Sequence, residues 1–181
     1  MNAKLSVFAL TIVGLVGCAT NRAPDVADNV RNSLKQAGLN DVSVSQDRDK
    51  GVVTLRGNVP QDADKVRAEQ IAKPLIAGQV LADEIGVLPP GNESAAKSVN
   101  SDLDKGIEAN LDAAFTQANM KGISHSTTNG VVTLKGELET PSRRSDAEHV
   151  ASAVPNVQQV VNKIDVKNQR ATSSSSADRS K

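Results

Sequence analysis

Few side chains in this sequence have the types and spacing that covalent or acid–base chemistry requires. The 181 residues include one cysteine, Cys18, and two histidines, His125 and His149. A single cysteine excludes a disulfide within the chain. Two histidines without a carboxylate cluster at metal-ligand spacing do not predict a metal site. No Ser–His–Asp or Cys–His arrangement is suggested either, so we expect no enzyme, no cofactor and no metal centre.

The surroundings of Cys18 indicate a different use for its thiol. Lys4 precedes an apolar run over residues 5–16, which is too short for a comfortable transmembrane helix and is typical of a signal peptide. The run leads into Leu15-Val16-Gly17-Cys18, which resembles a bacterial lipobox. In that motif a diacylglycerol is attached to the cysteine thiol, so we predict Cys18 as a lipidation site.

This prediction determines where in the cell we expect the mature protein to be located. We expect residues 1–17 to be a lipoprotein signal peptide and residues 18–24 to be a short lipidated tether. Ala19, rather than an aspartate, follows the cysteine. By resemblance to Gram-negative lipoproteins, this implies an outer-membrane protein that is lipid-anchored and faces the periplasm.

Arg143 and Arg144 are the candidate lipid-contacting side chains, because they open a predicted helix. Guanidinium groups there could meet the phosphates of lipid head groups, whereas a solvated helix start is the alternative interpretation. His125 aligns with Val44 in a strand column that faces the core, so we interpret it as a structural, buried or half-buried histidine. His149 is expected to be exposed on a helix.

The elements that would position these residues belong to an internal repeat. The stretch Gly51-Val52-Val53-Thr54-Leu55-Arg56-Gly57 recurs 79 residues later as Gly130-Val131-Val132-Thr133-Leu134-Lys135-Gly136. Each copy predicts a strand, and we expect the flanking Gly51, Gly57, Gly130 and Gly136 to be structural, since the turns need backbone angles that glycine adopts cheaply. The alignment continues without a gap downstream and shifts by two upstream. The length difference therefore falls in the hairpin loop, and the chain is one unit used twice.

Each copy predicts the order helix, strand, strand, helix, strand. We therefore predict an α+β fold of two tandem αββαβ two-layer sandwiches, each a three-stranded mixed sheet with two helices on one face. The units are expected over residues 25–88 and 102–167, with a linker over 89–101 and a disordered, Ser-rich tail over 168–181.

Several boundaries and core positions follow from the same periodicity. Ser101 is a candidate N-cap for the first helix of the second unit. Val66 and Leu103 are expected in the buried stripes of their helices. The closing strand of the second unit is expected over residues 157–166.

Composition restricts the classes of partner. Basic and acidic side chains balance at 21 each, there is no Trp or Tyr, and only two phenylalanines are present. Neutral charge and the lack of aromatic stacking platforms argue against a nucleic-acid partner. Both units carry a small acidic excess, so attraction to anionic lipid would require a local cationic patch.

Motifs of the second copy resemble the BON domain. These are the Gly130–Gly136 strand, Ala147-Glu148-His149-Val150-Ala151, and Val160-Val161-Asn162-Lys163-Ile164-Asp165-Val166. The first copy departs from the pattern at Asp83, where the second has Asn162, and at Gly78-Gln79. The resemblance covers about 130 residues. A lipobox followed by two such domains is similar to dual-BON outer-membrane lipoproteins, whose secreted relatives include an osmotically induced periplasmic protein.

The resemblance implies a non-enzymatic protein that binds phospholipid membrane surfaces and supports outer-membrane integrity or stress tolerance. The alternative is a protein-interaction adaptor, which would dock an envelope partner through its BON domains. A lipid-binding helix should carry a cationic rim beside exposed apolar side chains, whereas a docking module needs an exposed sheet edge or patch.

Overall fold

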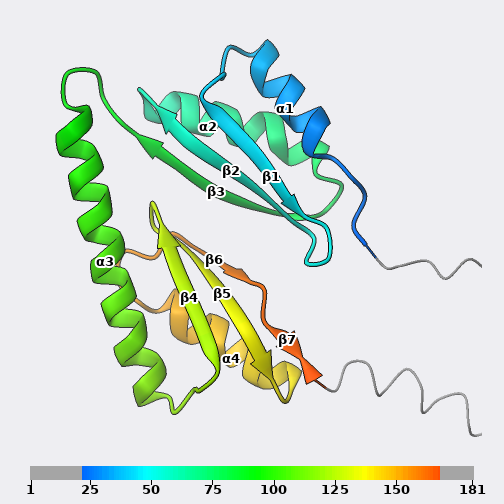
Figure 1. Ribbon diagram of the computed structural model, residues 1–181, viewed down its shortest axis with the longest axis vertical. Coiled ribbons are helices and arrows are strands. Elements are labelled where there is room, and N and C mark those ends of the chain that lie inside the picture. Colours follow the sequence, from blue (N-terminus) through cyan, green and yellow to red (C-terminus); the bar gives the residue numbers. More distant parts are fainter. Residues whose placement is uncertain (1–21, 168–181) are drawn as a thin grey trace, which may run out of the picture.

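The repeated strand is the central strand of a sheet in each half of the chain. In the computed structural model, which describes residues 22–167, the first sheet has the order β1-β2-β3 and the second has the order β4-β5-β6 (Figure 1). The signal peptide, Cys18 and the tail from residue 168 lie outside the described residues. The predicted α+β class, with two mixed sheets in tandem units, is confirmed.

The first unit contains two helices and three strands. Its elements are α1 (Ala27–Gln36), β1 (Val42–Asp47), β2 (Val52–Val59), α2 (Asp62–Ala72), a short 3-10 turn (Lys73–Leu75) and β3 (Val80–Val87). β1 pairs antiparallel with β2, and β3 pairs parallel with it. Val53 and Leu55 alternate with outward residues and are fully buried with Val30 and Leu34 of α1, so the helices cover one face of the sheet.

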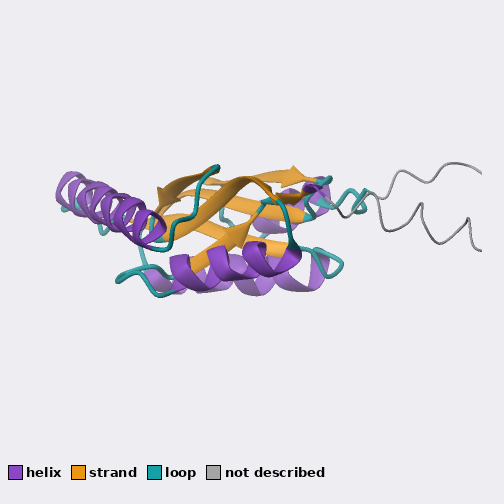
Figure 2. Cartoon of the chain, turned by 90° about the horizontal axis from the view of Figure 1, so that it is seen from below, coloured by secondary structure: helices purple, strands orange, loops and turns teal. Residues whose placement is uncertain are grey.

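The second unit repeats this arrangement with two differences. Its elements are α3 (Glu93–Gln117), β4 (Ile123–Thr128), β5 (Val131–Leu138), α4 (Pro141–Ser152), β6 (Gln159–Asn162) and β7 (Asp165–Val166). Its core joins Ile107, Leu111 and Phe115 of α3 to Val132 and Leu134 of β5. From below, the helices are seen mainly under the strand layer, and the long α3 lies beside it (Figure 2).

The first difference is the start of α3, where the predicted N-cap Ser101 is wrong. The helix begins at Glu93 after Asn92, so most of the expected linker is helical. The segment 93–102 contains no proline or glycine, which makes helix continuation inexpensive. Ile107 is the first buried hydrophobic residue of α3, so the apolar pattern marked the helix only where it meets the core.

The second difference is the closing strand, which is divided into β6 and β7. The Oδ1 atom of Asn162 accepts a hydrogen bond from the backbone N–H of Ile164 at 3.2 Å. The backbone N–H of Lys163 instead donates to the carbonyl of Leu134 at 2.9 Å. This local turn interrupts the regular ladder with β5.

The glycines that flank the repeated strands all have positive φ angles, namely 63° at Gly51, 135° at Gly57, 78° at Gly130 and 140° at Gly136. A Cβ atom at Gly57 would overlap the carbonyl oxygen of Asp41, and one at Gly136 would overlap that of Gly122. Both the backbone angle and the close approach therefore require glycine at these two positions.

The two units meet through β3 and β6, which lie side by side as edge strands (Figure 1). The side chain of Gln159 on β6 spans two groups of β3, since Nε2 donates to the carbonyl of Leu81 at 2.7 Å and Oε1 accepts from the N–H of Asp83 at 3.3 Å. Residues on the helix-free faces form a joint apolar cluster of Val52, Ala82, Val131 and Val161. We call the contact formed by Gln159 and this cluster the inter-unit contact.

The hairpin of each unit also reaches the last strand of the other unit. Asn129 Nδ2, in the β4–β5 turn, donates to the carbonyl of Glu84 at 2.9 Å. Conversely, Asp47 at the end of β1 accepts from Lys163 Nζ at 3.1 Å. Because Glu84 and Lys163 are equivalent repeat positions, the two units are related by an approximate two-fold arrangement.

Candidate functional site

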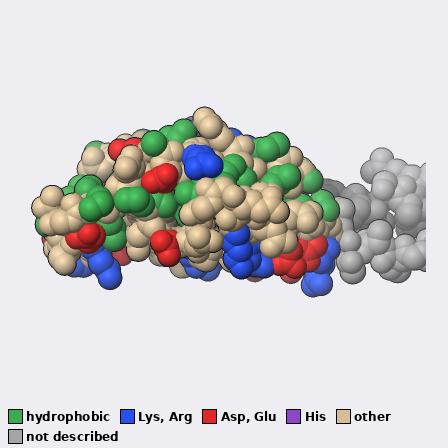
Figure 3. All heavy atoms as spheres, turned by 90° about the horizontal axis from the view of Figure 1, so that it is seen from above, with side chains coloured by type: hydrophobic (Ala, Val, Ile, Leu, Met, Phe, Trp, Pro, Cys, Tyr) green, Lys and Arg blue, Asp and Glu red, His purple; other side chains and the backbone are tan. Residues whose placement is uncertain are grey.

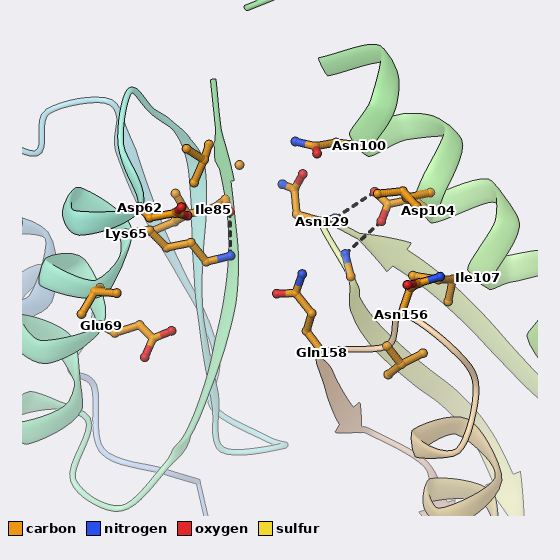
Figure 4. Close-up of a pocket in the computed structure, with 16 residues that line it drawn as sticks. Asp62, Lys65, Glu69, Ile85, Asn100, Asp104, Ile107, Asn129, Asn156 and Gln158 are labelled. Carbon is orange, nitrogen blue, oxygen red and sulfur yellow. Dashed lines mark hydrogen bonds between the residues drawn. The ribbon is translucent and has the colours of Figure 1, made fainter. Parts of the chain in front are cut away.

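A cleft of about 630 Å³ lies between the two units. Lys65 and Glu69 of α2 stand on one side of it, and Asn100 and Asp104 of α3 stand on the other (Figure 4). Gln158 also lines the cleft. The cleft is therefore built from elements of both units and combines side-chain amides, charges and apolar surface.

The charged groups of the cleft are used to hold the structure together. Asp104 Oδ2 accepts from the backbone N–H of Asn129 at 2.8 Å, and its Oδ1 accepts from that of Gly130 at 2.9 Å (Figure 4). Lys65 Nζ donates to the carbonyl of Ile85 at 3.0 Å across the other wall (Figure 4). These contacts fix the β4–β5 turn and the end of β3.

A buried carboxyl group lies behind this wall, on β3. Asp83 Oδ1 accepts from the N–H of Ile85 at 3.1 Å, while Oδ2 is buried without a hydrogen-bond partner among the described residues. Burial and the neighbouring carboxyl of Glu69 together raise the pKa of Asp83 to about 6. The neighbouring carboxyl of Asp83, together with Lys73, holds the pKa of Glu69 below its usual range.

The predicted lipid-contacting arginines are both engaged with backbone carbonyls. Arg144 Nη2 donates to the carbonyl of Asn162 at 3.2 Å, at the end of β6. Arg143 is exposed, and its Nη2 donates to the carbonyl of Asn119 at 3.3 Å. The hydroxyl of Thr140 accepts from the backbone N–H of Arg143 and caps α4. The role of both arginines at a lipid surface stays a prediction.

Neither histidine is part of a chemical constellation. His125 is half-buried, its Nε2 lies 3.0 Å from Asp112 Oδ1, and its ring packs on Phe115 with centroids 5.8 Å apart. This position agrees with the structural interpretation. His149 is exposed on α4. Within residues 22–167 no group of three or more His, Cys, Asp or Glu side chains could hold a metal ion.

Three exposed apolar side chains lie at the cleft or one helical turn from it, which sequence reasoning missed. Val66 on α2 is 51% exposed and Leu103 on α3 is 47% exposed, so their predicted burial is wrong. Both line the cleft, and Val99, 57% exposed, lies one turn before Leu103. Their positions in the helical apolar patterns placed Val66 and Leu103 in the core, but both side chains line the cleft between the units instead. No helix in the described part of the chain is long and apolar enough to cross a membrane.

The fold and the cleft define a tandem pair of α+β modules. A family model of the BON domain matches residues 22–89 and again residues 103–168, so the chain belongs to the BON domain family and carries the domain twice. BON domains bind membranes or act in envelope-associated assemblies, and the family is generally non-catalytic.

Solved structures of CdsD, described as a structural protein of the type III secretion system of Chlamydia trachomatis, are similar at low identity. The CdsD C-terminal domain is 13% identical with a TM-score of 0.33, covering 78% of this chain and 97% of that one. A second CdsD structure is 12% identical with a TM-score of 0.38, covering 85% and 98%. No curated protein is significantly similar to this sequence.

Proposed function

We propose that this protein is an envelope lipoprotein that is anchored through acyl chains on Cys18 and contacts phospholipid surfaces with an apolar patch. The patch consists of Val66, Val99 and Leu103. Its support comes from the four exposed large hydrophobic side chains in the described residues, because Val66 and Leu103 line the same cleft and Val99 lies one turn before Leu103 on α3. Such side chains are ordinary when scattered singly, whereas a cluster indicates an interaction surface.

The charges around the patch favour insertion of apolar side chains over electrostatic attraction. Lys97 and Lys105 lie near it on α3, but Lys105 pairs with Asp102 at 3.2 Å, and α3 carries more acidic than basic residues. On the face seen from above, basic and acidic side chains are interspersed (Figure 3). Binding through the patch should therefore depend weakly on salt and on lipid charge.

This contact would add to the lipid anchor. Attachment at two points gives an avidity that exceeds either contact alone, provided that both reach the same surface. The protein would in this way support envelope integrity without catalysis, at the periplasmic face of the outer membrane.

Vesicle flotation tests the proposal with the chain that starts at Ala19, which lacks the acylated cysteine. The variant carrying Val99→Ser and Leu103→Ser should lose binding to vesicles of phosphatidylcholine, with or without phosphatidylglycerol. The expected loss is about 30-fold, from on the order of 1 kcal/mol for each half-exposed side chain. Val80→Ser is the matched control, because Val80 is 47% exposed at the start of β3, away from the patch.

Flotation that is equal for the double variant and for the parent chain would reject the patch as the lipid contact. If the parent chain floats with neither vesicle, the phospholipid function fails, and the adaptor alternative becomes the better explanation of the patch. Binding only to anionic vesicles, abolished by Arg143→Ala rather than by the patch variants, would restore the head-group site predicted from the sequence.

A further inference from the structure

A carboxyl pair of the first unit, Asp83 and Glu69, lies beside the inter-unit contact, and its hydrogen bonding depends on a proton. Asp83 lies on β3 with its side chain 8% exposed, and its backbone N–H is held by Gln159 of the other unit. One carboxyl oxygen accepts from Ile85, and the other is buried beside Glu69. The nearest cation is Lys65, whose Nζ is 3.9 Å from Oδ2, too far for a hydrogen bond.

The second unit contains the equivalent pair of side chains, and there the hydrogen bond between them does not depend on protonation. Asn162 occupies the position of Asp83, and Glu148 occupies that of Glu69. Asn162 Oδ1 accepts from the N–H two residues later, as Asp83 Oδ1 does. Asn162 Nδ2 donates to Glu148 Oε2 at 3.1 Å and to the carbonyl of Arg144 at 3.0 Å.

An aspartate has the shape of an asparagine, but its second oxygen donates only when it carries a proton. The bond that Asn162 always makes to Glu148 can therefore form between Asp83 and Glu69 only in the protonated state. When both carboxyls are ionised, the buried charge of Asp83 faces the partly exposed charge of Glu69 without a donor between them.

The surroundings of Asp83 give the ionised pair little compensation. The charged groups that face it are Lys65 and Glu69 of α2 and Lys73 of the 3-10 turn, and Lys73 is already paired with Glu69 at 2.7 Å. From the other unit the neighbouring side chains are Val131, Gln158 and Gln159, none of which titrates. Its neighbour on β2 is Leu55, and Arg56 pairs with Glu84 on the opposite face.

We propose that Asp83 and Glu69 form a proton-dependent latch that holds β3 against the second unit when the pair shares a proton and loosens this contact when both carboxylates are charged. Repulsion within the pair, and the water needed to relieve it, would displace the strand edge that Gln159 spans. Loosening would expose the buried apolar cluster of Val52, Ala82, Val131 and Val161.

The direction of the pH dependence follows from the pKa shifts. The pKa of Asp83 is raised from its model-peptide range to about 6, so the folded state keeps a proton that the unfolded chain releases. Its contribution to stability is complete below the unfolded pKa and is lost as pH rises to about 6 and above. The lowered pKa of Glu69 acts in the opposite sense, at more acidic pH, as the pair becomes fully protonated.

Exchanging the two repeat residues tests the latch in the full-length chain in detergent micelles. The thermal midpoint of the parent should fall by roughly 5 °C or more between pH 5 and pH 7.5. Asp83→Asn copies the arrangement of the second unit and should remove most of this fall. Asn162→Asp installs the same pair in the second unit and should enlarge the fall. Glu69→Gln, which removes the repulsion while keeping the shape, should also reduce it.

Hydrogen exchange at the Asp83 amide reports on the inter-unit contact itself. After correction for intrinsic exchange, its protection should drop about 10-fold or more from pH 5 to pH 7.5 in the parent and stay constant in Asp83→Asn. A fall in thermal midpoint that is the same in Asp83→Asn as in the parent would overturn the proposal. Protection of the Asp83 amide that does not change with pH would also overturn it, because the pair would then be structural only.

Discussion

Among single residues, the glycines at the end of the stretch shared by the two repeated strands, Gly57 and Gly136, are the most tightly constrained. Gly57 has a φ of 135°, and a Cβ there would overlap the carbonyl oxygen of Asp41, which is backbone and cannot rotate away. Gly57→Ala should therefore destabilise the protein by about 3 kcal/mol or more, from combined strain and displacement. Chemical denaturation of the variant measures the loss.

Gly38→Ala is the matched control for this experiment. Gly38 also has a positive φ, 81°, but nothing lies within 4 Å of the added Cβ. Only the backbone preference is then lost, which costs about 1–2 kcal/mol. Equal losses in the two variants would show that the approach of Asp41 contributes nothing.

The sequence predicted the need for glycine at these positions and also predicted a lipid contact for Arg144, which stays a prediction, but it did not predict the hydrogen bond that Arg144 makes within the fold. Arg144 caps the carbonyl of Asn162, and Lys65, at the equivalent position of the first unit, caps that of Ile85. A basic residue at the same place in both copies was a signal for this shared structural task. The matching basic residues were visible in the repeat alignment. The carbonyl groups that they bond could not be predicted, because these depend on how the helix packs on the sheet.

Among the elements, α3 does more than fill the core of the second unit. Asp104 accepts two backbone N–H groups of the β4–β5 turn. Asp104→Ala should cost about 1–3 kcal/mol, because both donors lose a charged partner. Asp102→Ala, two residues earlier, removes only an exposed pair with Lys105 and should be almost neutral. Urea denaturation of the two variants makes the comparison, and similar losses would contradict the role of Asp104.

The order of the elements was predictable from periodicity, and the extension of α3 was not. Ile107, Leu111 and Phe115 repeat every four residues and are buried together. Residues 93–102 have no apolar stripe against the core, so their helix rests on intrinsic propensity and on the turn at Asn92. The same extension explains why Val99 and Leu103 are exposed beside the cleft.

In the whole molecule, the relative placement of the units depends on contacts between residues far apart in the sequence. Burial favours a higher pKa for Asp47, but the hydrogen bonds from Lys163 and from the backbone N–H of Lys50, together with the charges of both lysines, outweigh this effect and lower the pKa. This ion pair is therefore lost only as pH falls through the acidic range, opposite in direction to the loosening at Asp83. No local pattern indicates such pairs, so the sequence predicted two units without predicting how they dock.

Gln159 provides a direct test of docking, because its side chain bonds only across the units in the contacts described and belongs to neither core. Gln159→Ala leaves the carbonyl of Leu81 and the N–H of Asp83 without these partners, which should weaken docking by about 1–3 kcal/mol. Both units should stay folded, since their apolar cores are unchanged. The population of separated units should rise, which limited proteolysis of the connection at residues 88–92 and the radius of gyration in solution both detect.

Gln36→Ala, at the exposed end of α1, is the control. Cleavage at the same rate in both variants would mean that the apolar cluster and the hairpin contacts alone hold the units together.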